Sequence, residues 1–148
     1  MKRKRRTTIL VKGNEQTAKL LADEIINKYP VTTIQKPDNG LIMLKMRESS
    51  QKKLFYLGEV LVTECKVQVA GVLGVGIVQD DKPEMAYHLA VIDAAYNAGL
   101  AETEKWERIL VEEEKRILDR EANERVSLLK TRVNFETMDA QGSVNDEI

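Results

Sequence analysis

Residues 55–79 constrain the fold more than any other part of the chain, because their apolar and polar side chains alternate. At the centre of this stretch the alternation is strict, through Glu64, Cys65, Lys66, Val67, Gln68 and Val69. A repeat of two residues puts the apolar side chains on one face, which is typical of a strand buried on one side. Ala70-Gly71 interrupts the pattern. We therefore predict two strands, at residues 55–69 and 72–79.

A hairpin signal precedes these strands. Residues 31–35 are rich in β-branched side chains, Pro37-Asp38-Asn39-Gly40 has turn chemistry, and residues 41–46 resume an apolar run. A polar connection at residues 51–53 then leads into the long alternating stretch. Together these signals predict an antiparallel sheet of about four strands.

Helical periodicity lies on both sides of this β block. Between Asn14, which suits an N-cap, and Pro30, the apolar residues mostly recur at steps of three and four. Pro83 suits the first turn of a second helix, which ends near Gly99 in the manner of a C-cap. A third, strongly charged helix is expected from about Glu102 to Leu129. Its apolar line consists of Trp106, Ile109, Leu110, Ile117, Leu118 and Val126.

Strands in one block and helices in the next predict an α+β fold. We expect an N-terminal helix, the sheet, two C-terminal helices and an extended C-terminal segment at residues 132–138 that docks by its apolar groups. A chain of 148 residues suits one domain. We place this domain at residues 9–138, between a disordered basic tail at 1–8 and a disordered acidic tail at 139–148.

Composition argues against several classes of protein. A net charge of −1 gives the whole chain no field that attracts polyanions. No apolar run reaches the roughly 18 residues of a membrane helix, and Ile9-Leu10-Val11 is too short for the core of a secretory signal. The single cysteine, Cys65, rules out an intramolecular disulfide. We expect a cytoplasmic protein that does not bind membranes.

The sequence has no complete constellation for catalysis or metal binding. Cys65 and His88 are too few to hold an iron–sulfur cluster, and they lie on different elements, which makes a poor zinc site. Residues 71–76 are rich in glycine but lack the Gly-Lys-Ser/Thr ending of a phosphate-binding loop. We expect no cofactor or metal on this chain, with Cys65 as a small core residue and His88 as a partly exposed helix residue.

Charged residues gather at two places. Glu112, Glu113 and Glu114 are expected to face solvent on the third helix. Residues 2–6 are all basic and suit either nucleic acid or an acidic protein surface. No aromatic residue lies among them to stack on bases, which argues against nucleic acid.

Three blocks of the chain resemble one protein family in their order and spacing. The first is Gly58-Glu59-Val60-Leu61-Val62-Thr63-Glu64, and the last is Arg132-Val133-Asn134-Phe135-Glu136-Thr137-Met138. Between them lie Gly74, Val78, Gln79, Ala86, Ala90, Ile92, Asp93 and Ala94. Over residues 14–138 these blocks resemble the G subunit of bacterial carbon–phosphorus lyase, often called PhnG. The chain departs from the family at Asp80, where glycine is frequent, and at Tyr87 and His88.

The resemblance implies a supporting subunit in the breakdown of organic phosphonates. In that family the complex replaces the adenine of ATP with methylphosphonate, which gives α-D-ribose 1-methylphosphonate 5-triphosphate. A radical iron–sulfur subunit cleaves the carbon–phosphorus bond later. ATP is then a co-substrate of a transferase complex, and this chain alone is not expected to be catalytic. The implied partners are the I subunit foremost, then the H, J and ATPase-like L subunits.

The resemblance also nominates residues for a subunit interface or a structural motif: Gly58, Gly74, Gln79, Ala86, Ala90, Asp93, Arg132, Phe135 and Met138. Ala86, Ala90 and Ala94 form a stripe of small residues, which is expected to pack on the sheet or on a partner chain. Two other functions remain open. One is a free-standing interaction module that docks through the charged helix from Glu102, and the other is nucleic-acid binding through the basic start.

Overall fold

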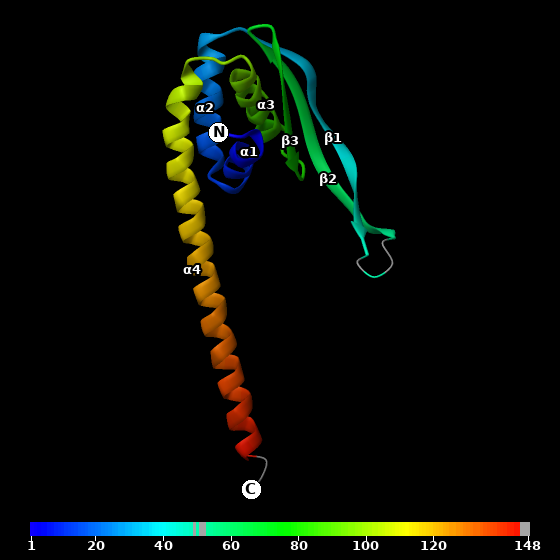
Figure 1. Cartoon of the computed structure of the whole chain (residues 1–148), viewed down its shortest axis with the longest axis vertical. Helices are drawn as coiled ribbons and strands as arrows, with labels where there is room; N and C mark the ends of the chain where they lie inside the picture. The colour runs from blue at the N-terminus through cyan, green and yellow to red at the C-terminus, as the bar shows by residue number, and fades with distance from the viewer. Residues whose placement is uncertain (49, 51–52, 146–148) are drawn as a thin grey trace.

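The computed structural model describes the backbone of residues 1–148 except 49, 51–52 and 146–148, and side chains up to Val133 apart from those three internal positions. Four helices and a three-stranded antiparallel sheet make up this described part (Figure 1). The elements are α1 (Arg3–Lys12), α2 (Glu15–Lys28), β1 (Val31–Arg47), β2 (Leu54–Val69), β3 (Val72–Gln79), α3 (Pro83–Asn97) and α4 (Glu102–Asn145). This arrangement confirms the predicted α+β class, with helices before the sheet and two helices after it.

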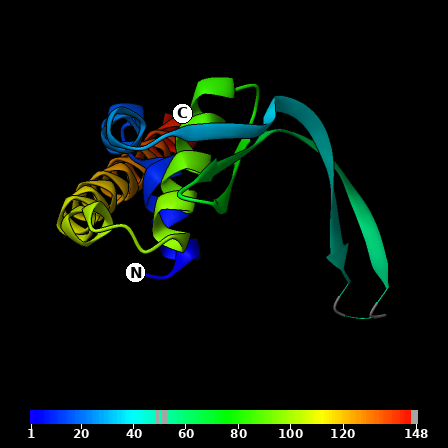
Figure 2. The ribbon, with the colours of Figure 1, turned by 90° about the horizontal axis from the view of Figure 1, so that it is seen from above.

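The three strands lie in the order β1-β2-β3. β3 pairs with the second half of β2, from Val62 opposite Gln79 to Val69 opposite Val72. The first half of β2 pairs with the outer end of β1, up to Leu54 opposite Arg47. These outer halves form a two-stranded ribbon, which bends away from the rest of the molecule (Figure 2).

The predicted turn at residues 37–40 is wrong, and the two strands expected on either side of it are one strand, β1. The sheet of the described residues therefore has three strands instead of about four. Pairing with β2 overrides the local turn chemistry, and register shifts before Asp38 absorb the irregularity. β1 is an edge strand, so Pro37, which lacks an N–H, is tolerated there.

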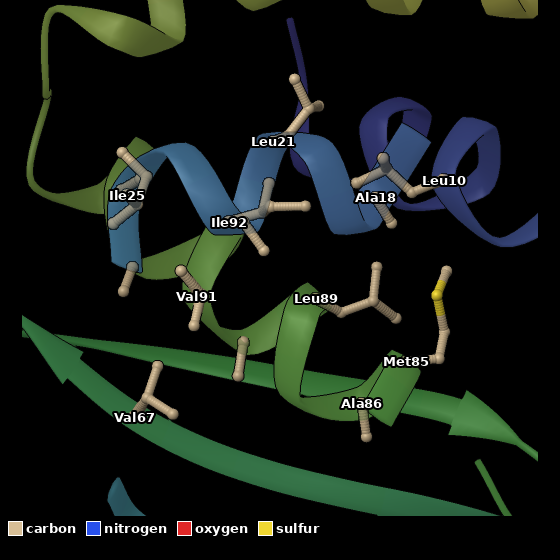
Figure 3. Packing of buried hydrophobic residues seen from close by; sticks show 14 of the residues in the cluster. Leu10, Ala18, Leu21, Ile25, Val67, Met85, Ala86, Leu89, Val91 and Ile92 are labelled. Carbon is tan, nitrogen blue, oxygen red and sulfur yellow. The ribbon is translucent and has the colours of Figure 1, made fainter. Parts of the chain in front are cut away.

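The core lies where α3 is covered by the sheet on one side and by α2 on the other (Figure 3). On β2 the predicted alternation is confirmed, since Thr63, Cys65, Val67 and Val69 are buried and the residues between them are partly exposed. α1 and α4 close the far side of α2 and α3, and they contribute five side chains to the core: Ile9, Leu10, Trp106, Leu110 and Ile117.

The signals for helix ends were accurate in α2 and α3. The Asn14 side chain accepts a hydrogen bond from the backbone N–H of Gln16 at 2.9 Å, so it caps α2 as predicted. Pro83 begins α3, and Gly99 just beyond its end has φ +66°, a left-handed conformation that favours glycine.

Both ends of the chain differ from the prediction. Residues 3–12 form α1 instead of a disordered tail, because Ile9 and Leu10 enter the core and Arg6 is 5% exposed. α4 continues beyond Leu129 to Asn145, so residues 132–138 are helical and not extended. Residues 102–141 contain neither glycine nor proline to stop the helix. Residues 139–145 of the predicted acidic tail are helical as well, and 146–148 lie outside the described residues.

None of the helices in the described part of the chain is both long enough and apolar enough to cross a membrane.

Candidate functional site

Two glycines of β3 face α3 with no room for a side chain. A Cβ atom on Gly74 would lie 2.2 Å from the carbonyl oxygen of Ala90, and one on Gly76 would lie 2.1 Å from the carbonyl oxygen of Ala86. The small-residue stripe of α3, which includes Ala94, therefore packs on the chain's own sheet. Of the two partners that the sequence left open for this stripe, the structure shows the sheet.

The buried Asp93 is the centre of a polar cluster that joins α1, β3 and α3. Its carboxylate accepts hydrogen bonds from Arg6 Nη2 at 3.0 Å, from Arg3 Nη2 at 3.2 Å and from the backbone N–H of Val75 at 2.9 Å. Its side chain is 7% exposed, so these donors replace water around the charge. The cluster fixes the position of α1 on α3 and β3.

Arg6 is the buried cation of this cluster. Burial lowers its pKa, and the neighbouring Asp93 carboxylate counters that shift. The guanidinium also lies 3.9 Å from the centroid of the Tyr96 ring, which gives a cation–π contact. Arg5, on the exposed side of α1, donates to Glu114 from Nε at 3.0 Å, which lowers the pKa of Glu114. Three arginines of the basic start, at positions 3, 5 and 6, thus pair with acids of the same chain.

Glu113 corrects the prediction that the acidic run of α4 faces solvent. It is buried, and it accepts a hydrogen bond from the backbone N–H of Asn14 at 2.9 Å and one from Arg116 at 3.0 Å. At the start of α4, the buried Glu102 is paired with Lys28 and accepts from the Tyr29 hydroxyl, and the Lys28 hydrogen bond is the main cause of its lowered pKa. These acids anchor the first part of α4 to the N-terminal helices.

An open cleft of about 480 Å³ lies between α2, the irregular part of β1 and the start of α3. Tyr87 and His88 of α3 line this cleft, and burial lowers the pKa of His88 and raises that of Tyr87. Lys19 and Lys36 bring positive charge to the cleft and Glu84 brings negative charge. His88 is partly exposed and Cys65 is buried on its strand, as predicted. Among the described residues, no three His, Cys, Asp or Glu side chains are grouped so that they could hold a metal ion.

Two parts of the molecule extend from the body, and we call them the ribbon (residues 41–47 and 54–61) and the α4 arm (residues 122–145). Figure 1 shows the α4 arm running on well past the other elements. Its apolar side chains Val126, Leu129 and Val133 recur at helical spacing and are each at least half exposed. Both parts therefore present apolar surface that the body of this chain does not cover.

The nominated residues fall into separate groups. Gly74, Ala86, Ala90 and Asp93 meet at the contact between β3 and α3. The other nominated residues lie elsewhere: Gly58 in the ribbon, Gln79 at the end of β3, and Arg132, Phe135 and Met138 on the α4 arm. The side chains of Phe135 and Met138 lie outside the described residues. Sequence reasoning missed Arg3 and Arg6, although an aspartate among the apolar residues of α3 indicates a cationic partner.

The fold and its surfaces first define a class: a small α+β protein with an internal polar cluster and two apolar projections, as expected of a subunit of a larger assembly. The family model of the phosphonate metabolism protein PhnG matches residues 1–140. The chain therefore belongs to this family, the G subunits of carbon–phosphorus lyase. No curated protein matches the chain. Its role lies in phosphonate metabolism, as a member of the multi-subunit carbon–phosphorus lyase complex.

Proposed function

We propose that this chain supports the step in which carbon–phosphorus lyase forms α-D-ribose 1-methylphosphonate 5-triphosphate from ATP and methylphosphonate, with displacement of adenine. The complex acts as a transferase in the cytoplasm, where ATP is available. The observation that carries the proposal is the pair of uncovered apolar projections on a chain of this family. Such a chain completes and stiffens a site that other subunits largely build.

The partners in this proposal are the I subunit foremost, followed by the H, J and ATPase-like L subunits. The chain binds no cofactor of its own, and ATP is a co-substrate of the whole complex. Nucleic-acid binding has less support than it has from the sequence alone, because Arg3, Arg5 and Arg6 are paired with Asp93 and Glu114. A phosphate backbone would have to compete with these carboxylates for the same cations.

Reconstitution tests the proposed function. The H, I and L subunits are co-expressed with and without this chain, and each preparation is incubated with ATP and methylphosphonate. Adenine is measured by chromatography and the phosphonate product by phosphorus NMR, with ATP alone as the control. We expect product only when the chain is present, and none from the purified chain by itself. An equal rate without the chain, or turnover by the chain alone, contradicts the proposal.

A free-standing interaction module is the second candidate, because the same two projections would serve it. A tagged chain that co-purifies with none of the carbon–phosphorus lyase subunits favours this alternative. Stoichiometric co-purification with the I subunit excludes it.

A further inference from the structure

The face of the sheet that is turned away from α3 changes its chemistry along β2. Within the body it carries Glu64, Lys66 and Gln68, as expected for a sheet face in water. Further out, on the ribbon, the same face carries only apolar side chains and Gly58. Directly paired residues share a face, and three pairs define this one: Ile42 with Val60, Leu44 with Gly58, and Met46 with Phe55. The change from polar to apolar coincides with the point where β3 ends and the ribbon leaves the body.

The opposite face of the ribbon mixes apolar and charged side chains. Its pairs are Leu41 with Leu61, Met43 with Glu59, Lys45 with Tyr56, and Arg47 with Leu54. The Tyr56 hydroxyl donates to Glu59 at 3.0 Å, so this acid already has a partner. Among the described residues, no ion pair involves Lys45 or Arg47. Two cations therefore remain for an acidic group on a partner.

The uncovered area is that of a protein interface. Ten large apolar residues of the ribbon are between 39% and 62% exposed: Leu41, Ile42, Met43, Leu44, Met46, Leu54, Phe55, Tyr56, Leu57 and Leu61. At about 150–200 Å² for a large side chain they expose on the order of 800 Å². One partner contributes about 800 Å² to a standard interface, and the largest apolar patch of a typical monomer is about 300–600 Å². A two-stranded ribbon is also marginally stable in water without such cover.

We propose that the ribbon inserts into a groove of another subunit of the complex. One wall of this groove is apolar and meets Ile42, Leu44, Met46 and Phe55. The other wall combines apolar side chains with acidic groups that pair with Lys45 and Arg47. Gly58 lies on the apolar face with open space above it, so the backbone of the partner can come close there. The inference rests on the proposed function for one point, the identity of the partner as a carbon–phosphorus lyase subunit.

A groove fits the ribbon better than a second copy of this chain. Two copies stacked through their apolar faces would cover one face each and leave Leu41, Met43 and Leu61 in water. They would also leave Lys45 and Arg47 without acids. A groove covers both faces and supplies the missing charges.

Paired substitutions test the inference in the co-expressed complex. The double variant Leu44→Ser/Phe55→Ser removes two anchors from the apolar face, and Lys45→Glu/Arg47→Glu reverses the charge on the other face. The matched control, Glu64→Ser/Lys66→Ser, changes the same face of β2 within the body. We expect each ribbon variant to retain about tenfold less partner subunit on a tagged chain, and the control to retain the normal amount. Circular dichroism and the Tm of the isolated variants should stay near wild type, because the substituted residues lie outside the core.

The outcomes separate the two proposals. If the wild-type chain binds no carbon–phosphorus lyase subunit, the proposed function fails. If the wild-type chain binds them and Leu44→Ser/Phe55→Ser binds them equally well, the ribbon inference alone is overturned. A wild-type chain that forms dimers by light scattering, with dimers lost in that variant and the assembly intact, assigns the ribbon to a second copy and also overturns the groove.

Discussion

Gly74 faces the backbone of α3 at a distance that excludes a side chain. In Gly74→Ala the new carbon would lie 2.2 Å from the Ala90 carbonyl oxygen and 2.3 Å from the Ala94 nitrogen, and backbone atoms cannot swing aside as a flexible side chain can. We expect a loss of about 1–3 kcal/mol in the free energy of unfolding, as for other overpacked sites. Thermal unfolding should show a Tm several degrees lower.

Gly40→Ala is the matched control for this substitution. Gly40 is also a strand glycine, but a Cβ there has no neighbour within 4 Å. The Tm of Gly40→Ala should stay within about 2 °C of wild type, since surface substitutions rarely change the free energy of unfolding by more than about 0.5 kcal/mol. Equal effects of the two substitutions would mean that the contact with α3 does not set the cost, because Gly40 has no such contact.

Asp93 and Arg6 should be strongly coupled. Asp93→Asn leaves the Arg6 cation buried without its counter-charge, and breaking a buried pair in this way costs about 3–5 kcal/mol. The double variant Arg6→Met/Asp93→Asn removes the stranded charge, so we expect it to be less destabilised than the sum of the two single variants. Denaturant unfolding of all four proteins measures the coupling. Additive effects would show that the two residues act independently.

The elements that depend on local signals were predicted from the sequence, and those that depend on contacts between distant residues were not. α2, α3 and β3 are set by local signals such as the Asn14 cap, Pro83 and Gly99, and these match the structure. β1 depends on pairing with β2, which overrides the turn chemistry of residues 37–40. α1 depends on contacts about a hundred residues away, with Asp93 and Glu114, which periodicity cannot reveal. For the same reason Asp93 was nominated as a site residue from the sequence, whereas its partners Arg3 and Arg6 were not.

The α4 arm should be dispensable for folding and needed for assembly. Ending the chain after Glu121 keeps the ion pair between Lys12 and Glu121 and all the buried residues of α4 named above. It removes Val126, Leu129 and Val133, whose side chains are each at least half exposed. We expect a Tm within a few degrees of wild type, with much less I subunit on the tagged chain. A large fall in Tm would instead assign the arm to the stability of this domain.

At the scale of the whole molecule, a self-contained body carries two projections that both need cover. α4 has 44 residues, so it spans about 65 Å at 1.5 Å per residue and extends well past the sheet and the other helices (Figure 1). An isolated helix of this composition gains little stability in water, because helices in proteins depend on a packed apolar face. The ribbon has the same need on both of its faces. The molecule therefore reaches its final stability when it joins its partners.

Hydrogen exchange measures this directly. In the isolated chain we expect slow exchange in the body, where Val67 and Ile92 lie in the core, and fast exchange in the ribbon and the α4 arm, because few buried contacts oppose their local opening. In the co-purified complex both projections should become protected, while the body changes little. Protection of the arm without the ribbon would leave the α4 interface standing and rule out the groove. Protection that is equally strong in the isolated chain would show that neither projection needs a partner, because local opening would then be suppressed by the chain itself.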